Sequence, residues 1–153
     1  MIETIFRLSG LVVLPFWALM IFLPHWRVTR KLMSSPLVSA VPALFYAALV
    51  IPRFPEVWQA VSSPELQGIA GLLGSPVGAL IGWLHFLAFD LFVGRWIYLE
   101  GLERGSSAWV LSPVLFLTLM LGPCGFLLYL IVRRTRSYLS GSKNLIPVST
   151  GSK

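Results

Sequence analysis

Long runs of apolar residues, each free or nearly free of charged side chains, dominate this chain. Each run approaches or exceeds the ~20 residues that a helix needs to cross ~30 Å of hydrocarbon. The runs are residues 8–24, 32–52, 69–89 and 105–132. They predict four membrane-spanning helices, at Ile5–Leu23, Leu37–Ile51, Pro76–Leu99 and Pro113–Val132.

The connecting segments complete the predicted fold. Residues 52–75 are rich in Pro and Gly and contain Glu56 and Glu65, so we expect no span there but a short interfacial helix at Pro64–Leu73. The last residues, 140–153, are polar and contain Gly, Ser and Lys, which predicts a disordered tail. The fold class is therefore an all-α membrane protein. We expect a four-helix transmembrane bundle over residues 1–139, with an interfacial helix between spans two and three.

Composition supports a membrane location and excludes several functions. The 153 residues are 56% hydrophobic and 12% charged, with a mean hydropathy of +0.80, whereas roughly 25% of residues are charged in soluble domains. The net charge of +6 sits beside apolar segments and forms no basic stripe with stacking aromatics, so we expect no nucleic-acid partner. The single cysteine, Cys124, excludes an intrachain disulfide, and we expect no metal and no cofactor.

The distribution of basic residues gives only a narrow preference for orientation. With four spans, the two sides hold four basic residues (Arg27, Arg30, Lys31, Arg104) and five (Arg7, Arg53, Arg133, Arg134, Arg136) near the span ends. The positive-inside rule then places both termini in the cytoplasm. The first apolar run is long and lacks a small-residue cleavage site, so we expect a retained span, without a Ser- and Arg-rich transit sequence before it.

The third predicted span carries the ionisable residues that matter most. Counted from Pro76 at 1.5 Å per residue, His85 lies ~14 Å and Asp90 ~21 Å deep, within the hydrocarbon zone. At 100° per residue, His85, Asp90 and Arg95 point to three different faces. This pattern predicts that the third span is the most buried of the four. Asp90 is expected to pair with another span, through Arg7, Tyr46 or Thr118.

Two interpretations of these polar residues stay open from the residues alone. His85 and Asp90 either hold helices together as satisfied polar groups or transfer protons, because a buried carboxyl beside a histidine suits acid and base chemistry. Arg95 either reaches the membrane boundary with its long side chain or anchors a polar group of a substrate. A haem held by His25 and His85 is disfavoured, since the two imidazoles lie at different depths.

Aromatic and small residues suggest how a flat, apolar ligand could bind. The chain contains ten Phe, six Trp and four Tyr, which serve packing and the interfacial belt or line a groove for a polyene such as a carotenoid. Small-residue spacing at glycines 71, 74, 78 and 82 equally serves helix packing. The sequence from Gly122 to Gly125, Gly-Pro-Cys-Gly, predicts a kink in the fourth span and a local groove at mid-depth.

Three motifs connect the chain with a known family. They are Leu-Leu-Gly-Ser-Pro at 72–76, the stretch 82–96 with its His-x-x-x-x-Asp-x-x-x-x-Arg core, and Gly-Pro-Cys-Gly at 122–125. Over about residues 5–136 the chain resembles the abscisic-acid-deficient-four family, the neoxanthin synthase-like membrane proteins of plastids, cyanobacteria and other bacteria. The resemblance implies a four-span protein of a thylakoid or bacterial inner membrane that acts in carotenoid metabolism, where plant members are needed to convert violaxanthin to neoxanthin.

The conversion that the resemblance implies is an isomerisation, in which an epoxide opens to a hydroxyl while a neighbouring proton leaves. It needs an acid and a base but no redox cofactor, and His85 and Asp90 are the expected catalytic residues. The expected substrate-binding residues are Arg95, Phe89, Phe92 and Trp96. The competing hypothesis is a non-catalytic subunit that binds a lipophilic pigment or docks on a photosynthetic membrane complex. The bilayer itself is a partner in both cases.

Overall fold

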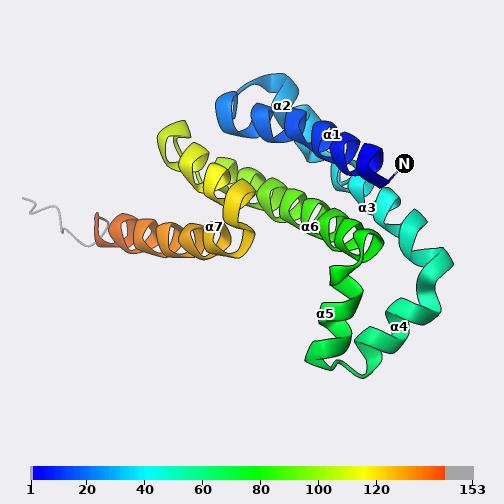
Figure 1. Cartoon of the computed structure of the whole chain (residues 1–153). Coiled ribbons are helices and arrows are strands. Elements are labelled where there is room, and N and C mark those ends of the chain that lie inside the picture. Colours follow the sequence, from blue (N-terminus) through cyan, green and yellow to red (C-terminus); the bar gives the residue numbers. More distant parts are fainter. Residues whose placement is uncertain (1, 144–153) are drawn as a thin grey trace, which may run out of the picture.

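The structure is a computed structural model that describes residues 2–143, with side chains as far as Thr135; within these residues it contains helices and no strands (Figure 1). The all-α class is therefore confirmed. Four segments are long and apolar enough to cross a membrane, as predicted: Ile2–Phe22, Leu37–Ser62, Pro76–Glu103 and Ala108–Thr135. The elements in chain order are α1 (Ile2–Phe22), α2 (Arg27–Ser34), α3 (Leu37–Val50), the 3-10 turn η1 (Ile51–Arg53), α4 (Phe54–Ser62), α5 (Leu66–Gly74), α6 (Pro76–Glu103) and α7 (Ala108–Lys143).

The second apolar segment continues beyond the end that the sequence predicted. Helical backbone runs from α3 through η1 into α4 and ends at Ser62, eleven residues past Ile51. Pro52 and Pro55 fall within the first two positions of η1 and α4. Backbone N–H groups in a first helical turn have no partner within the helix, so proline costs no hydrogen bond there. The prolines therefore bend this segment instead of ending it, as the turn from α3 to α4 shows (Figure 1).

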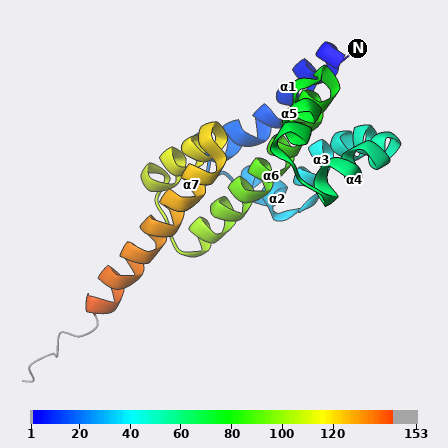
Figure 2. The ribbon, with the colours of Figure 1, turned by 60° about the horizontal axis from the view of Figure 1, so that its bottom comes forward.

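The predicted short helix between spans two and three is confirmed as α5, Leu66–Gly74, shifted by two residues at its start. It lies across the beginning of α6 (Figures 1 and 2). At the other end of the chain, α7 is described to Lys143. Residues 144–153, which make up most of the predicted tail, lie outside the described residues, so the tail stays a prediction.

Helix α6 is the centre of the bundle. It begins sharply because the hydroxyl of Ser75 accepts a hydrogen bond from the Gly78 N–H (3.0 Å) and Pro76 occupies the first turn. Of the apolar windows in the four candidate spans, that of α6 is the most buried, at 39% against 17–33%, which confirms the prediction for the third span. Its Gly94 lets the α1 helix approach closely, because a Cβ there would overlap the ring of Trp17.

The fourth apolar segment, α7, is folded back on itself. Leu121 (φ −137°, ψ 37°) and Gly122 (φ 13°, ψ −82°) leave the helical conformation. A Cβ on Gly125 would overlap the backbone of Thr118, although residues seven apart in a continuous helix lie ~10 Å apart along the axis. Pro123 explains the break, since its ring excludes the helical hydrogen bond and clashes with the preceding turn. The predicted kink is confirmed, and Figures 1 and 2 show that it amounts to a hairpin.

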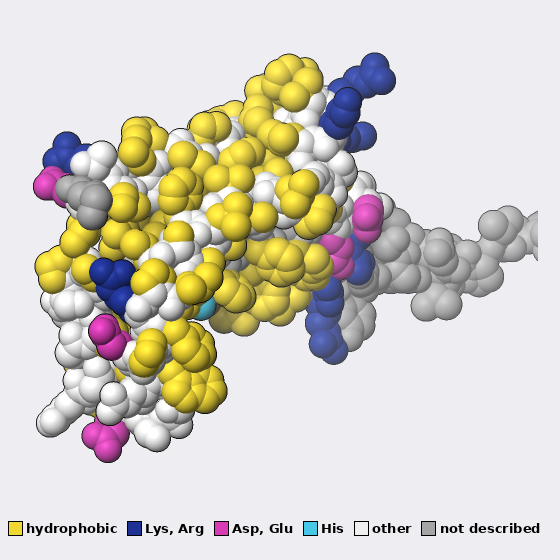
Figure 3. Space-filling model, turned by 90° about the vertical axis from the view of Figure 1, so that its right-hand side faces the viewer, with side chains coloured by type: hydrophobic (Ala, Val, Ile, Leu, Met, Phe, Trp, Pro, Cys, Tyr) yellow, Lys and Arg dark blue, Asp and Glu magenta, His cyan; other side chains and the backbone are white. Residues whose placement is uncertain are grey.

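Charged side chains gather at the two ends of the bundle, with a mostly apolar surface between them (Figure 3). We call the end where α2 lies against the last part of α6 the basic end. Tyr98 donates a hydrogen bond to the Pro24 carbonyl there (2.7 Å), and Glu100 pairs with Arg104 and Arg133. The opposite end carries the start of α1, η1, α4 and α5. The apolar surface between the ends has the character that a surface facing lipid acyl chains requires.

Candidate functional site

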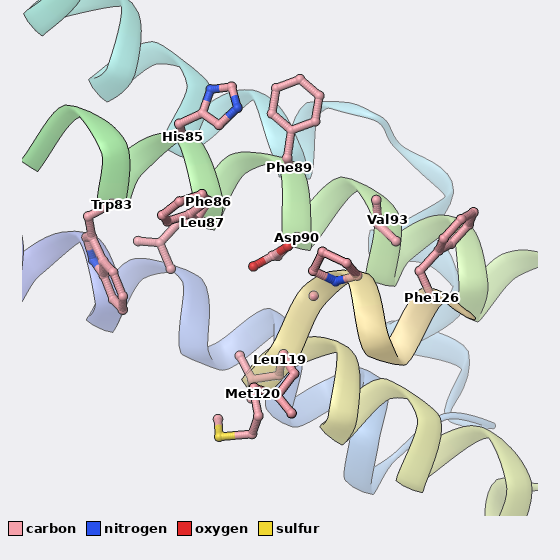
Figure 4. A pocket seen from close by; sticks show the side chains of 13 residues that line it. Trp83, His85, Phe86, Leu87, Phe89, Asp90, Val93, Leu119, Met120 and Phe126 are labelled. Atoms are coloured by element: carbon pink, nitrogen blue, oxygen red, sulfur yellow. The ribbon is translucent and has the colours of Figure 1, made fainter. Parts of the chain in front are cut away.

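A cavity of about 770 Å³ lies between α6 and the turn of α7, beside Asp90 at the middle of α6 (Figure 4). Helix α6 supplies one wall, and the break in α7 supplies the other. Asp90 and His85 are the two ionisable residues among the described ones that line it. The lining residues are Trp83, His85, Phe86, Leu87, Phe89, Asp90, Val93, Leu119, Met120, Leu121, Gly122, Pro123 and Phe126.

Asp90 points from α6 toward the turn of α7 (Figure 4). A Cβ placed on Gly122 would lie 3.1 Å from the carboxyl carbon of Asp90, so the carboxyl rests directly against this glycine. The second half of α7 begins here with Pro123, and the amino end of a helix carries a partial positive charge that favours a carboxylate. The break in α7 therefore places the amino end of a helix beside Asp90.

The expected pairing of Asp90 with another span is wrong. Arg7 pairs with Glu3 on its own helix at 2.7 Å, and Thr118 donates to the Val114 carbonyl at 2.8 Å. Tyr46 lies against His85, with ring centroids 5.6 Å apart. Within the described part of the chain, no hydrogen bond to the Asp90 carboxyl is formed. The reversal of α7 is the physical reason, because it brings Gly122 to the position where a straight helix would present a side chain.

His85 lies on a different side of α6 from Asp90, as the helical spacing predicted (Figure 4). Its ring stacks on Phe89 at 4.7 Å between centroids, with an interplanar angle of 27°, and is otherwise exposed. Among the described residues its side chain has aromatic neighbours and no hydrogen-bond partner. His85 and Asp90 thus border one cavity from two directions, with Phe89 between them along the helix.

Arg95 reaches from α6 to the end of α2. Its Nε donates to the Met33 carbonyl (2.6 Å) and its Nη2 to the Ser34 carbonyl (2.9 Å), which are at the end of α2. The side chain therefore satisfies carbonyls that a helix end leaves without partners. It does not line the cavity. Glu100, one helical turn and one residue further on, binds Arg104 and Arg133.

The three expected aromatic residues do not form one continuous groove. Phe89 borders the cavity and also a second hollow of about 320 Å³ between α3 and α6, where Phe92 lies with it. Trp96 packs against Phe126 and Tyr129 of α7, at 5.8 and 5.5 Å between ring centroids. Phe92 and Trp96 are thus separate from the space around Asp90.

The residues that sequence reasoning missed belong to the wall formed by α7. Leu119, Met120 and Leu121 end its first half, and Phe126 follows the break. The Gly-Pro pair signalled a break at this depth. Nothing in the apolar pattern on either side distinguishes a bent span from a hairpin, so the contact with Asp90 could not be predicted.

Comparison with known proteins adds a family to this geometry. A family model described as ABA DEFICIENT 4-like matches residues 4–129. The chain belongs to this family. Protein ABA DEFICIENT 4, chloroplastic, from Arabidopsis thaliana, is 34% identical over 108 residues, which are 67% of this chain and 49% of that protein. The chain thus spans about half the length of this relative. No solved structure matches.

The ABA DEFICIENT 4-like match covers every residue that lines the cavity, from Trp83 to Phe126. It ends four residues before Arg133, which pairs with Glu100 at the basic end. The cavity therefore lies entirely within the part of the chain that defines the family. With four apolar helical segments, this member of the family is a multi-pass membrane protein.

Proposed function

We propose that this protein acts in carotenoid metabolism and isomerises an epoxy-xanthophyll or a related carotenoid end group by acid and base catalysis. The observation that carries the proposal is the environment of the Asp90 carboxyl. Its carboxyl has no hydrogen-bond partner in the described chain, lies against Gly122 and borders an apolar cavity. Ionisable groups inside a membrane are costly, so a carboxyl without a hydrogen-bond partner is a candidate for chemistry.

The proposed reaction rearranges bonds within one molecule. A proton is delivered to the epoxide oxygen as a C–O bond breaks, which produces a hydroxyl. A second proton leaves the neighbouring carbon, and its bonding electrons form the new double bond of an allene. Asp90 and His85 are the two groups at the cavity that can deliver and accept these protons. Atoms and electrons balance without an oxidant or a reductant.

The size and lining of the cavity support this class of substrate. Its volume of about 770 Å³ falls within the ~300–1,000 Å³ typical of small-molecule pockets. Aromatic and aliphatic side chains make up most of its wall, which favours a cyclic end group followed by a polyene. Phe86 and Phe89 are exposed on the surface of α6 beside it, so such a substrate could enter sideways from the lipid. The substrate class implies a pigment-bearing membrane, thylakoid or bacterial inner membrane.

The test measures carotenoid conversion in a host that makes violaxanthin. Asp90→Asn keeps the size of the side chain and removes its ability to exchange protons, so we expect turnover to fall at least ~100-fold. His85→Gln is expected to act in the same direction. Glu103→Gln is the matched control, because it changes an acid on the same helix outside the cavity. Pigments are separated chromatographically, with equal amounts of inserted protein.

Two results would overturn the proposal, the first in its chemistry and the second as a whole. If inserted Asp90→Asn retains full conversion, the acid and base assignment is wrong. If the wild-type protein leaves the carotenoid inventory unchanged but alters the assembly of a photosynthetic complex, the protein is an accessory subunit that binds pigment.

A further inference from the structure

The two halves of α7 follow α6 in opposite directions. Near the start of α7, Leu111 packs on Gly101, where an added Cβ would lie 2.7 Å from a leucine methyl group. At its break, Gly122 lies against Asp90. Beyond the break, Arg133 again reaches the level of Glu100, with 3.1 Å between Nη1 and Oε1. The segment therefore starts beside the end of α6, reaches the middle of this helix and returns.

We infer that the fourth apolar segment is re-entrant, so that the described part of the chain crosses the membrane three times and the start of α1 lies on the opposite side from Thr135. A straight helix from Ala108 would carry Arg133 ~37 Å along its axis, enough to cross the membrane. The ion pair with Glu100 instead returns Arg133 to the side from which the segment entered. This inference concerns membrane topology and does not depend on the proposed reaction.

The lengths of the segments agree with this topology. Asp90 is ~20 Å from either end of α6, at 1.5 Å per residue. The first half of α7, 108–120, is also ~20 Å long and so ends near the level of Asp90. Non-helical backbone is tolerated at membrane depth where protein buries it or where it lines a water-filled cavity. Leu121 and Gly122 line the cavity beside Asp90, so this topology requires that water enters the cavity.

The distribution of charge becomes unequal under this topology. Nine basic residues near the ends of the apolar segments are divided five to four by four crossings. With three crossings, seven of these nine lie at the basic end and two at the opposite end. Those at the basic end are Arg27, Arg30, Lys31, Arg104, Arg133, Arg134 and Arg136, and those at the opposite end are Arg7 and Arg53. The positive-inside rule then places the basic end on the side from which the chain is inserted. This topology differs from the expectation of both termini on one side.

Cysteine labelling tests the topology in the full chain. In a Cys124→Ser background, single cysteines are introduced as Ser63→Cys, Ser107→Cys and Thr135→Cys, all at exposed positions. Both topologies place 63 and 107 on opposite sides, so these two are the references. An impermeant maleimide is applied to intact bacterial cells and to inverted vesicles. We expect Thr135→Cys to react in inverted vesicles, as Ser107→Cys does. Reaction of Thr135→Cys in intact cells, as for Ser63→Cys, or from both sides, overturns the inference.

A cross-link provides a second measurement that does not depend on vesicle sidedness. The pair Glu100→Cys and Arg133→Cys, in the same background, should be joined by a short bifunctional maleimide, because the native side chains touch. Arg53→Cys with Arg133→Cys is the control pair, since η1 lies at the opposite end. Joining of the control pair without the first pair would mean that α7 crosses the membrane.

Discussion

Two stretches of α6 differ sharply in how their polar side chains are satisfied. In residues 91–103, Arg95 and Tyr98 donate to backbone carbonyls of the α1–α3 region, and Glu100 holds two arginines. In residues 83–90, neither His85 nor Asp90 has a hydrogen-bond partner within the described residues. Apolar burial does not divide the helix in this way, since Leu84 is as completely buried as Leu91 and Ile97. One helix therefore combines a half whose polar side chains are paired with a half in which His85 and Asp90 are not.

This contrast separates structural from chemical roles. Leaving a buried polar group without its partner costs ~1–3 kcal/mol, so substitutions in 91–103 should lower the free energy of unfolding. Substitutions of polar groups that have no partner remove no such contribution. We therefore expect substitutions of polar residues in 83–90 to lower turnover, and those in 91–103 to lower the free energy of unfolding.

The largest expected loss of stability is at Gly94. Gly94→Ala places a methyl group inside the ring of Trp17, a side chain that is 1% exposed and cannot move without disturbing the core. Overpacking of this kind costs ~1–3 kcal/mol. The measurement is reversible unfolding in mixed detergent micelles. Gly10→Ala is the matched control, because a Cβ there meets nothing within 4 Å. Equal stability of the two variants would show that α1 and α6 are not held at this distance.

A smaller loss is expected at Arg95. Arg95→Lys keeps the charge but replaces the planar fork that reaches two adjacent carbonyls, so one of the two hydrogen bonds is lost. We expect the free energy of unfolding to fall by about 0.5–1.5 kcal/mol, the net contribution of an ordinary hydrogen bond, because the bond to Ser34 is exposed to solvent. Asp90→Asn should leave stability unchanged in the same assay. If Arg95→Lys is neutral while retention of a hydroxylated carotenoid falls, Arg95 binds the substrate after all.

The fold could be predicted because its strongest determinant is local. Apolar runs of membrane-spanning length fix the helices, and the Pro76 and Gly122–Pro123 signals fix a start and a break. The extension of the second segment to Ser62 was missed because prolines within a first helical turn look like breakers in sequence.

The candidate site was predictable in its residues but not in its surroundings. Helical spacing placed His85 and Asp90 on different faces correctly, since that depends on one helix alone. The partners of Asp90 and Arg95 depend on how separate helices meet. Gly122 and the α2 carbonyls are backbone groups, which no side-chain pattern in the sequence reveals.

The smallest expected loss of stability is at Glu100, and it tests whether ion pairs help to hold α7 against α6. Glu100→Gln removes both ion pairs that join α6 to Arg104 and to Arg133 of α7. The Glu100 side chain is only 15% exposed, but its partners are 46% and 36% exposed, so solvent screens the attraction. We expect a loss of ~0.3–1 kcal/mol, which shrinks as salt concentration rises. Glu103→Gln, one turn away, is the control. A loss above that range that does not change with salt would mean that the ion pairs of Glu100 are the main contacts that stabilise the hairpin of α7. No loss would mean that the apolar contacts of Trp96 with Phe126 and Tyr129 hold it instead.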